Sequence, residues 1–258
     1  MIKIGEKISE ELKNGKIRKI LKDLDTNHTE NMLLTFDLEY EKPERVEVFL
    51  NDTSNYLILW KGLNPPTASI VAESNNEVDE LLRKVEDMRC SFIIKPSLSN
   101  PIERMYEQKM KRENWIMFSN KKVNFKSFIK QEVEALDAEP IYAEQISKNW
   151  LYSDNSDYIM EKMELYPFYG IKKGKELLAH AGIIAETDKD SFLAAAFTKP
   201  EWRRKGIQTS LTSKLTEDAL QRGKTPCMYI IEGNVPSIKA VSKVGYEPIA
   251  VHARFDPI

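Results

Sequence analysis

The chain has 258 residues, of which 41% are hydrophobic and 30% are charged, a balance typical of an ordinary globular protein rather than a disordered or fibrous one. Its 38 Lys and Arg residues against 40 Asp and Glu residues give a net charge of −2, so no overall basic field exists to hold a nucleic acid or an anionic membrane. No apolar run approaches the roughly 20 residues that span a bilayer, and the first residues are too polar to open a signal peptide, which predicts a cytoplasmic protein.

The first half of the chain has the pattern of helix followed by short strands. Apolar residues at helical spacing predict helix up to about Tyr40. They are Ile8, Leu12, Ile17, Ile20, Leu21 and Leu24. Runs of β-branched and aromatic residues then predict strands over 46–50, 56–60 and 68–71.

A helix is predicted next, because Ser74 and Glu77 have the spacing of a capping box. The apolar stripe behind them consists of Val78, Leu81, Leu82 and Val85. A strand over 92–94, a helix over 102–110 and a strand over 115–118 complete the first half.

The chain turns polar and basic between Ser119 and Gln131, and we place a boundary between two lobes there, 1–125 and 126–258. The elements predicted beyond it are a strand over 133–136, helices over 141–151 and 158–165, and strands over 168–171, 177–185 and 192–198, the last two forming an antiparallel hairpin. A helix over 207–221, a strand over 227–231, a helix over 237–243 and a strand over 249–254 follow. Both halves end in the order strand, helix, strand, helix, strand, so the predicted fold class is α/β, with a mixed sheet (α+β) in two lobes that an old duplication would explain.

The two cysteines and three histidines show no metal-ligand spacing. Cys90 and Cys227 each lie in a short apolar run, so both are expected to be buried, unreactive thiols. We predict no metal site and no redox role.

The turn after the strand over 192–198 has the features of an anion site. Gly206 has no Cβ, so the backbone can bend closely around a ligand at the start of the next helix, where unpaired N–H groups attract negative charge. The cations beside it are Arg203, Arg204 and Lys205. The matching junction of the first half carries two glutamates, which would repel a phosphate, so only the second junction is predicted to bind an anion. A solvated basic loop is the alternative interpretation.

Two segments follow the order of a known pair of motifs. The first is Arg203-x-x-Gly206, and the second contains Asn234, Ser237, Ala240 and Lys243-Val244-Gly245-Tyr246. Over about residues 133–258 the sequence resembles the GNAT superfamily of N-acyltransferases. It is most similar to the glycine N-acyltransferase-like branch, on the basis of Asn149-Trp150, Pro167 and the run over 198–203, and the first half resembles a degenerate copy of the same fold.

The resemblance implies that acetyl-CoA, or another acyl-CoA, lies between parallel strands over 192–198 and 227–231. Backbone groups of Ala196, Phe197 and Thr198 would bind its pantetheine amides. The diphosphate would be held by N–H groups of Arg204, Lys205, Gly206, Ile207, Gln208 and Thr209. From the same motifs we assign Arg203, Asn234, Ser237 and Lys243 to the coenzyme site, with a helix-capping role as an alternative for Asn234.

The sequence departs from the family at three positions. Gln208 stands where the loop usually has Gly or Ala, Val241 where many relatives have a tyrosine acid, and Phe192 where a glutamate base is expected. An amine of pKa ~10.4 loses its proton at pH 7 at a cost of about 4.6 kcal/mol, so a base matters more than an acid.

Candidate bases are Glu186, Glu232 and His180. The alternatives are a solvated residue beside a turn for Glu186, a loop carboxylate for Glu232 and a sheet histidine with satisfied hydrogen bonds for His180.

The predicted function is N-acyl transfer, in which an acetyl or other short acyl group passes from acyl-CoA to an amine acceptor by direct attack. The acceptor is a small-molecule or peptide amine, which residues 149–169 do not specify, and a homodimer is left open. Two other functions fit the same sequence: a coenzyme-binding regulatory or interaction module that has lost the chemistry, and a protein–protein adaptor that uses the first lobe.

Overall fold

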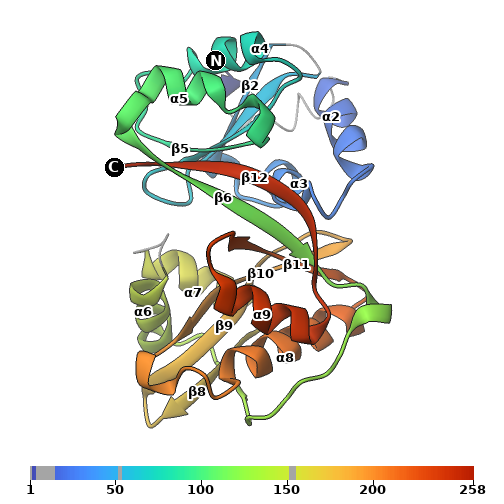
Figure 1. Cartoon of the computed structure of the whole chain (residues 1–258), viewed down its shortest axis with the longest axis vertical. Coiled ribbons are helices and arrows are strands. Elements are labelled where there is room, and N and C mark those ends of the chain that lie inside the picture. Colours follow the sequence, from blue (N-terminus) through green and yellow to red (C-terminus); the bar gives the residue numbers. More distant parts are fainter. Residues whose placement is uncertain (1, 4–14, 52–53, 151–154) are drawn as a thin grey trace. The chain divides into compact units, whose positions relative to one another are not determined.

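The computed structural model describes residues 2–3, 15–51, 54–150 and 155–258 of the chain (Figure 1). They divide into two compact units, Met1–Ile116 with Ala250–Ile258, and Met117–Ile249. The part of the predicted first helix that contains Ile8 and Leu12, and the helix end predicted at Leu151, lie outside the described residues.

The first unit contains a mixed sheet in the order β1-β2-β3-β4-β5-β12. Its strands are β1 (Ile2–Lys3), β2 (Val46–Leu50), β3 (Tyr56–Trp60), β4 (Thr67–Val71), β5 (Ser91–Ile94) and β12 (Glu247–Pro257). β4 and β5 pair in parallel, whereas the pairings of β1 with β2, β2 with β3, β3 with β4 and β5 with β12 are antiparallel. The strands predicted over 46–50, 56–60 and 68–71 are therefore confirmed.

The helices of this unit are α2 (Lys16–Asp25), α3 (Met32–Glu39), α4 (Asn75–Leu82) and α5 (Asn100–Tyr106). The predicted capping box is present at α4, where the Ser74 side chain accepts from the Glu77 N–H and the Glu77 carboxylate accepts from the Ser74 N–H. A core of fully buried residues joins α4 and α5 to the sheet, including Leu57, Phe92 and Ile102. α5 ends at Tyr106, four residues before the predicted end, and Met110 already begins strand β6 (Met110–Ser119).

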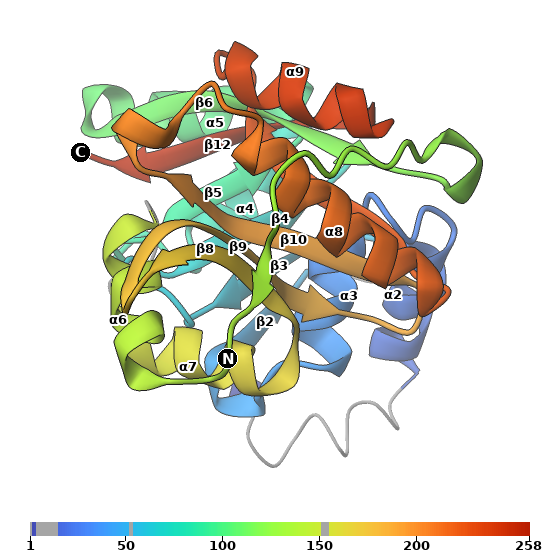
Figure 2. The same cartoon turned by 90° about the horizontal axis from the view of Figure 1, so that it is seen from below.

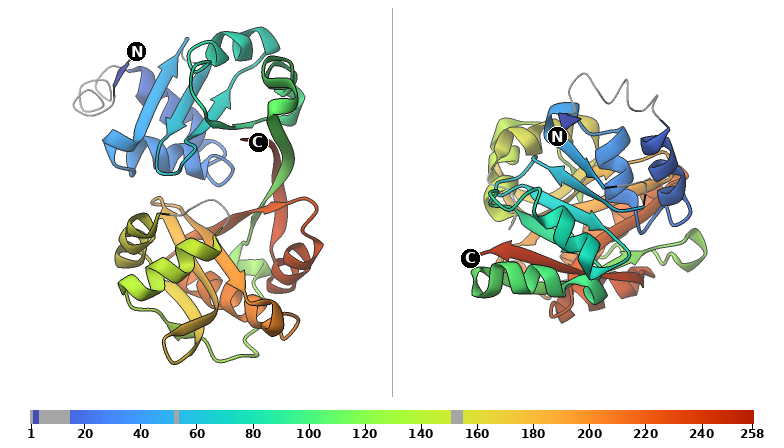
Figure 3. Two further views of the ribbon diagram at one scale, coloured as in Figure 1. Left: turned by 90° about the vertical axis from the view of Figure 1, so that its left-hand side faces the viewer. Right: turned by 90° about the horizontal axis from the view of Figure 1, so that it is seen from above.

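The second unit contains strands in the order β11-β10-β9-β8-β7. They are β7 (Glu134–Ala135), β8 (Phe168–Lys173), β9 (Glu176–Glu186), β10 (Asp190–Thr198) and β11 (Thr225–Ile231). β9 and β10 form the predicted antiparallel hairpin, and β10 pairs in parallel with β11. Helices α6 (Pro140–Asn149) and α7 (Ser156–Leu165) cover one face of these strands, and α8 (Ile207–Gln221) and α9 (Val235–Val244) cover the other (Figures 1 and 3).

The last strand departs from the division predicted at residue 125. Ala253, Arg254 and Phe255 of β12 pair with β5, so residues 250–258 are part of the first unit. The apolar pattern of a strand shows which face it buries but not which sheet it joins, and this is why sequence order alone assigned the segment to the second half.

Helix α8 has the bounds that its apolar face predicts, and Ile207, Leu211, Leu215 and Ala219 are all buried. Its opposite side is rich in Ser and Thr and is buried as well. Residues 120–131, which we call the strap, run along this side (Figure 2), and Thr216 contacts the hydroxyl of Tyr246, which follows α9. Ser213 accepts the N–H of Phe128 at 2.9 Å, and Ser210 accepts the N–H of Lys130 at 3.1 Å.

The strap is also fixed to the end of α9. The Lys126 N–H donates to the Val244 carbonyl at 2.9 Å, and the Asn120 amide donates to the same oxygen at 2.9 Å. Gly245 adopts a φ of 101°, and a Cβ added there would lie 1.9 Å from the Asn124 carbonyl oxygen. A glycine is therefore required where the strap crosses the end of α9.

In the described part of the chain no helix is long and apolar enough to cross a membrane. The same residues contain no cluster of His, Cys, Asp and Glu side chains that could hold a metal ion. Cys90 and Cys227 are buried free thiols, and burial raises the pKa of both, that of Cys90 to about 12.

Candidate functional site

The two central parallel strands of the second unit separate partway along their length. Their registered pairing ends at Phe192 and Cys227, whereas β10 continues to Thr198 and β11 to Ile231. On its other side β10 carries register shifts between Phe192 and Leu193 and between Ala194 and Phe197. Ala195, inside the second shift, has a φ of 51°, a left-handed conformation that is unusual for alanine. The predicted opening between these strands is present, and it leaves backbone groups of β10 beyond Phe192 without a ladder partner on β11.

His180 of β9 holds the irregular part of β10 in place. Its Nδ1 lies 2.7 Å from the Ala195 carbonyl oxygen, which can only accept, so Nδ1 carries the proton. Nε2 therefore bears the lone pair, is buried, and has no hydrogen-bond partner among the described residues. Burial lowers the pKa of His180 to about 4, so the ring is neutral at pH 7. The ring also stacks on Phe197 with 5.7 Å between centroids.

The start of α8 offers unpaired backbone donors. Gly206 is the N-cap with a φ of 78°, Arg204 is left-handed as well with a φ of 63°, and no side chain caps the helix. The N–H groups of Ile207, Gln208 and Thr209 have no acceptor among the described residues, because the first backbone bond of the helix is donated by Ser210. Left-handed residues in such a turn direct successive N–H groups to one side, which makes an anion-binding concavity.

Helix α4 of the first unit provides the contrast. Its start is closed by its own residues: the Glu77 carboxylate accepts from the N–H groups of Glu73 and Ser74, at 3.0 and 2.8 Å, and from the Asn55 amide at 2.8 Å. A carboxylate thus lies at the N-cap of α4, and the Ser74 hydroxyl accepts the Glu77 N–H of the first turn. That only the second junction binds an anion stays a prediction.

The basic residues around Gly206 are mostly exposed. Arg203 donates through Nε to the Thr198 carbonyl oxygen at 3.0 Å, which ties the loop to the end of β10. Lys205 lies 4.4 Å from the ring centroid of Trp202. Arg204 and Lys205 remain exposed to solvent, and the loop therefore carries positive charge at the open end of α8.

Gln208 fills part of the space between β10 and α8. Its Oε1 accepts from the Thr198 hydroxyl at 3.1 Å, and its Nε2 is buried without an acceptor in the described residues. A flipped amide would leave the carbonyl oxygen unpaired instead, so one polar atom is unsatisfied in either orientation. The residue that replaces the usual Gly or Ala therefore bridges the strand and the helix beside the open N–H groups.

The remaining predicted coenzyme residues divide into those near the opening and those with structural roles. Ala196 is exposed and Phe197 half-buried on β10. Asn234 caps α9, accepting the Ser237 N–H at 3.3 Å, which is the alternative role considered for it. Val241 is buried, so no side chain with a transferable proton is presented from that position.

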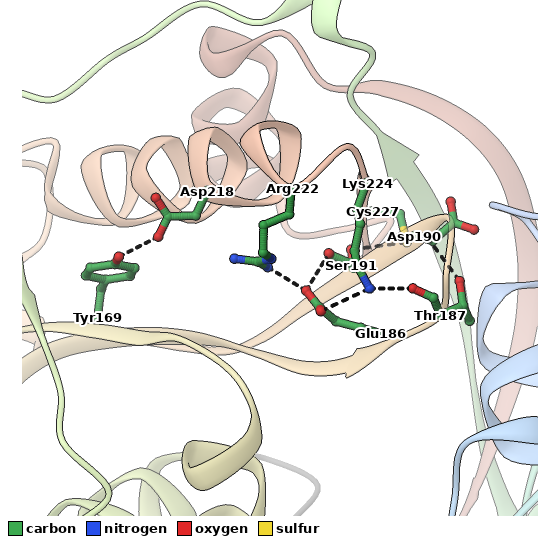
Figure 4. A network of polar contacts seen from close by, with 9 residues as sticks. All are labelled: Tyr169, Glu186, Thr187, Asp190, Ser191, Asp218, Arg222, Lys224 and Cys227. Atoms are coloured by element: carbon green, nitrogen blue, oxygen red, sulfur yellow. Dashed lines mark hydrogen bonds and ion pairs between the residues drawn. The ribbon is translucent and has the colours of Figure 1, made fainter.

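Glu186 is the last residue of β9 and lies at the turn of the β9–β10 hairpin, in a separate network of polar contacts (Figure 4). Its carboxylate accepts from Ser191 Oγ at 2.7 Å and pairs with Arg222 at 2.5 Å and Lys224 at 3.2 Å. Glu186 pairs with Ser191 in the β9–β10 ladder, and the strand rise places the bulge at Ala195 more than about 10 Å farther along. These contacts favour a structural role for Glu186 in closing the hairpin.

The other positions considered for a base are also dispersed. Phe192 is buried and packs edge-on against Tyr229 with 5.8 Å between ring centroids. Glu232 is exposed just after β11. His180, Glu186 and Glu232 are therefore not brought together at one point.

One part of the surroundings was missed by the sequence interpretation. Phe128 of the strap lies beside the α8 start, where its Cε1 would be 3.9 Å from a Cβ on Gly206. Lys130 and Lys243 both lie close to its ring, with Nζ at 4.9 and 5.8 Å from the centroid. The polar composition of residues 119–131 indicated a boundary between lobes and carried no signal for this placement.

Comparison with known families and structures places this geometry in a wider context. Residues 168–255 match the model of the FR47-like protein family. No match to the chain was found among curated proteins.

Solved structures resemble the chain over most of its length. A GCN5-related N-acetyltransferase-like protein from Streptococcus suis has a TM-score of 0.67 and 13% sequence identity, over 95% of this chain and 100% of that one. A GCN5-related N-acetyltransferase from Kribbella flavida gives 0.62 and 15%, over 82% and 89%. A tandem GNAT protein from the clavulanic acid biosynthesis pathway gives 0.53 and 13%, over 87% and 86%. The α/β fold predicted from the sequence is thus confirmed as a GNAT fold, with a mixed sheet.

Proposed function

We propose that this protein, which has the GNAT fold, transfers an acetyl or other short acyl group from acyl-CoA to the nitrogen of an amine acceptor. The observation that carries the proposal is the contrast between the starts of helices α4 and α8. α4 is closed by the Glu77 carboxylate, whereas α8 presents uncapped N–H groups beside the opening between β10 and β11. An anionic ligand with an extended arm fits this combination, because the helix start stabilises negative charge and the opening offers backbone groups to amides.

The geometry supports the following assignment of residues that would hold acyl-CoA. The N–H groups of residues 204–209 would bind the diphosphate, with Arg204 and Lys205 supplying positive charge around it. The backbone of Ala196, Phe197 and Thr198 would bind the pantetheine arm in the opening. When bound, acyl-CoA supplies an activated thioester whose carbonyl carbon is the site of attack.

The chemistry available from the chain itself is mainly positioning. His180, with a pKa of about 4, is a much weaker base than an amine of pKa ~10.4. Transfer of a proton from the protonated amine to His180 would therefore cost roughly 9 kcal/mol. The role of His180 is instead to hold the bulge at Ala195 through Nδ1, and Glu186 is held in a separate network. We infer that the acceptor attacks as the free amine and that its nitrogen bonds to the thioester carbon. The carbon–sulfur bond then breaks, coenzyme A leaves as its thiolate with the bonding electron pair, and the nitrogen's proton passes to water.

Isothermal titration with acetyl-CoA tests the binding step. The wild-type protein should bind, and Gly206→Glu should abolish binding, because the new carboxylate would place negative charge beside the uncapped N–H groups. Gly174→Glu is a matched control, since Gly174 also has a positive φ with open space around it but lies in the β8–β9 turn. Unaltered affinity in Gly206→Glu would contradict the assigned site.

A coenzyme-binding regulatory module is the second candidate function. It is favoured by the burial of Phe192 where a base is expected and by the engagement of Glu186 with Arg222 and Lys224. Release of free thiol from acetyl-CoA in the presence of mixed small-molecule and peptide amines separates the two, because a regulatory module would bind without turnover.

A further inference from the structure

Ser210, in the first turn of α8, joins the strap to the residue at which that helix opens. Its side chain is fully buried, and its Oγ lies 3.1 Å from the Gly206 carbonyl oxygen, 3.1 Å from the Lys130 nitrogen and 3.3 Å from the Gln131 nitrogen. A hydroxyl has one proton and two lone pairs. Because both strap groups are N–H donors, they take the lone pairs, and the hydroxyl proton is donated to the Gly206 carbonyl.

This bond acts on the peptide group that carries the first open donor of the helix. The Gly206 carbonyl and the Ile207 N–H belong to one planar trans peptide, so they point in opposite directions and turn together. The same carbonyl accepts the Ser210 N–H at 3.0 Å, and the two bonds from Ser210 hold the peptide plane so that the Ile207 N–H is directed out of the helix start. A hydrogen bond to the carbonyl also polarises the amide, which makes its N–H a stronger donor.

Packing alone restrains this peptide plane little. Gly206 has a φ of 78°, and a Cβ added there would meet only Phe128, at 3.9 Å, so the backbone lies in fairly open space. A glycine in such a position keeps access to many conformations. The hydrogen bonds of Ser210 are therefore the contacts that fix the orientation of the open donor.

Ser213, one turn farther along α8, provides an internal comparison. It is also fully buried, and its Oγ accepts the Phe128 N–H of the strap at 2.9 Å. In the described part of the chain, the hydrogen bond of this hydroxyl leads to the strap alone. The two serines thus differ in whether they reach the start of the helix.

We propose that Ser210 is a positioning residue for the anion site at the α8 start, through which docking of the strap raises the affinity for acyl-CoA. This role rests on the proposed function, because the anion concerned is the diphosphate assigned to residues 204–209. A donor that is already oriented binds more tightly, since less conformational freedom is lost on binding. Coupling of this kind is reciprocal, so a ligand that orders the Ile207 N–H also stabilises the strap on α8.

Isothermal titration of the whole chain with acetyl-CoA tests this role with a matched pair of variants. Ser210→Ala should weaken binding by about three- to tenfold, because a hydrogen bond that orders the site is lost. Ser213→Ala removes a buried hydroxyl and a bond to the strap without reaching Gly206, and it should keep the wild-type affinity. Ser210→Thr, which retains the hydroxyl, should bind like the wild type. Urea unfolding should show similar losses of stability in the two alanine variants.

Two further readouts would not respond to a merely structural serine. Acetyl-CoA should slow hydrogen exchange at the Lys130 and Gln131 N–H groups of the wild-type protein, while the Lys126 N–H, which is bonded to the Val244 carbonyl, should exchange at an unchanged rate. In the ligand-free protein, the heteronuclear NOE of the Ile207 amide should fall in Ser210→Ala and stay at its wild-type value in Ser213→Ala.

The outcomes separate this role from the proposed function. Wild-type affinity in Ser210→Ala, or an equal loss in both alanine variants, would overturn the positioning role while leaving the diphosphate site intact. Absence of acetyl-CoA binding by the wild-type protein would instead refute the proposed function. The Ile207 measurement needs no ligand, so an unchanged NOE in Ser210→Ala would overturn the positioning role in that case as well.

Discussion

His180 links the stability of the second unit to pH in a way that can be measured directly. Burial lowers its pKa to about 4 from an ordinary value of 6.5. Between these pH values the unfolded chain binds a proton at this residue and the native protein does not, so stability is full above about pH 6.5 and falls as the pH drops toward 4. A shift of this size corresponds to about 2 kcal/mol lost between pH 7.5 and pH 5.

The informative substitution is His180→Asn. The Asn side-chain amide can take the place of Nδ1–H and donate to the Ala195 carbonyl, but it does not titrate. The variant loses the contact between the imidazole ring and Phe197, which should lower its free energy of unfolding at pH 7.5 by about 1–3 kcal/mol. When the pH is lowered from 7.5 to 5, the free energy of unfolding should fall by about 2 kcal/mol less in the variant than in the wild type. His252, whose pKa burial and then Lys95 lower to about 4, keeps its own contribution in both proteins and cancels in the comparison.

Urea unfolding of both proteins at pH 7.5 and pH 5 provides the measurement. His180→Ala, which also removes the donor to Ala195, should in addition weaken acetyl-CoA binding, because the bulge loses its support. If His180→Asn lost as much stability as the wild type between the two pH values, the assignment of a buried, neutral His180 would be refuted.

Further predictions concern the opening, the strap and the reaction. Gln208→Ala should tighten acetyl-CoA binding several-fold in isothermal titration, because the side chain that bridges Thr198 and α8 is removed together with its unpaired amide; weaker binding would mean that the amide contacts the ligand. Gly245→Ala should lower the free energy of unfolding by more than about 3 kcal/mol, because its Cβ would overlap the Asn124 carbonyl. Gly206→Ala, whose Cβ would make only an ordinary contact to Phe128, should lower it by about 1–2 kcal/mol. Thermal or urea unfolding that ranked the two variants in the opposite order would contradict the described position of the strap. With no base assigned, kcat/KM for an amine should rise tenfold per pH unit from pH 7 up to the pKa of the acceptor; a plateau near neutral pH would reveal a base that the structure does not identify.

The sequence predicted the elements of the second unit closely because their signals are local. The apolar stripe from Ile207 to Ala219 and the Gly before it place α8 over the predicted residues, 207–221. The β9–β10 hairpin follows from two apolar runs joined by a short polar turn. The GNAT fold and the uncapped helix start follow from the same signals together with the family resemblance.

The features that sequence did not predict depend on long-range packing. Strand β12 pairs with β5 of the first unit, and Ser210 and Ser213 of α8 accept backbone N–H groups of the strap. The position of Phe128 beside Gly206 likewise results from contacts between segments about 80 residues apart, which no local pattern encodes. Glu186 was a reasonable candidate by its position in the hairpin, but its partners Arg222 and Lys224 come from beyond α8.

The diphosphate site can be tested at the atoms that define it by hydrogen–deuterium exchange with and without acetyl-CoA. Exchange at the N–H groups of residues 204–209 should slow markedly when the ligand is added, because each becomes a hydrogen-bond donor to it, while residues 73–77 at the closed start of α4 should exchange at the same rate in both states. Unchanged exchange at residues 204–209 in protein saturated with acetyl-CoA would contradict the account.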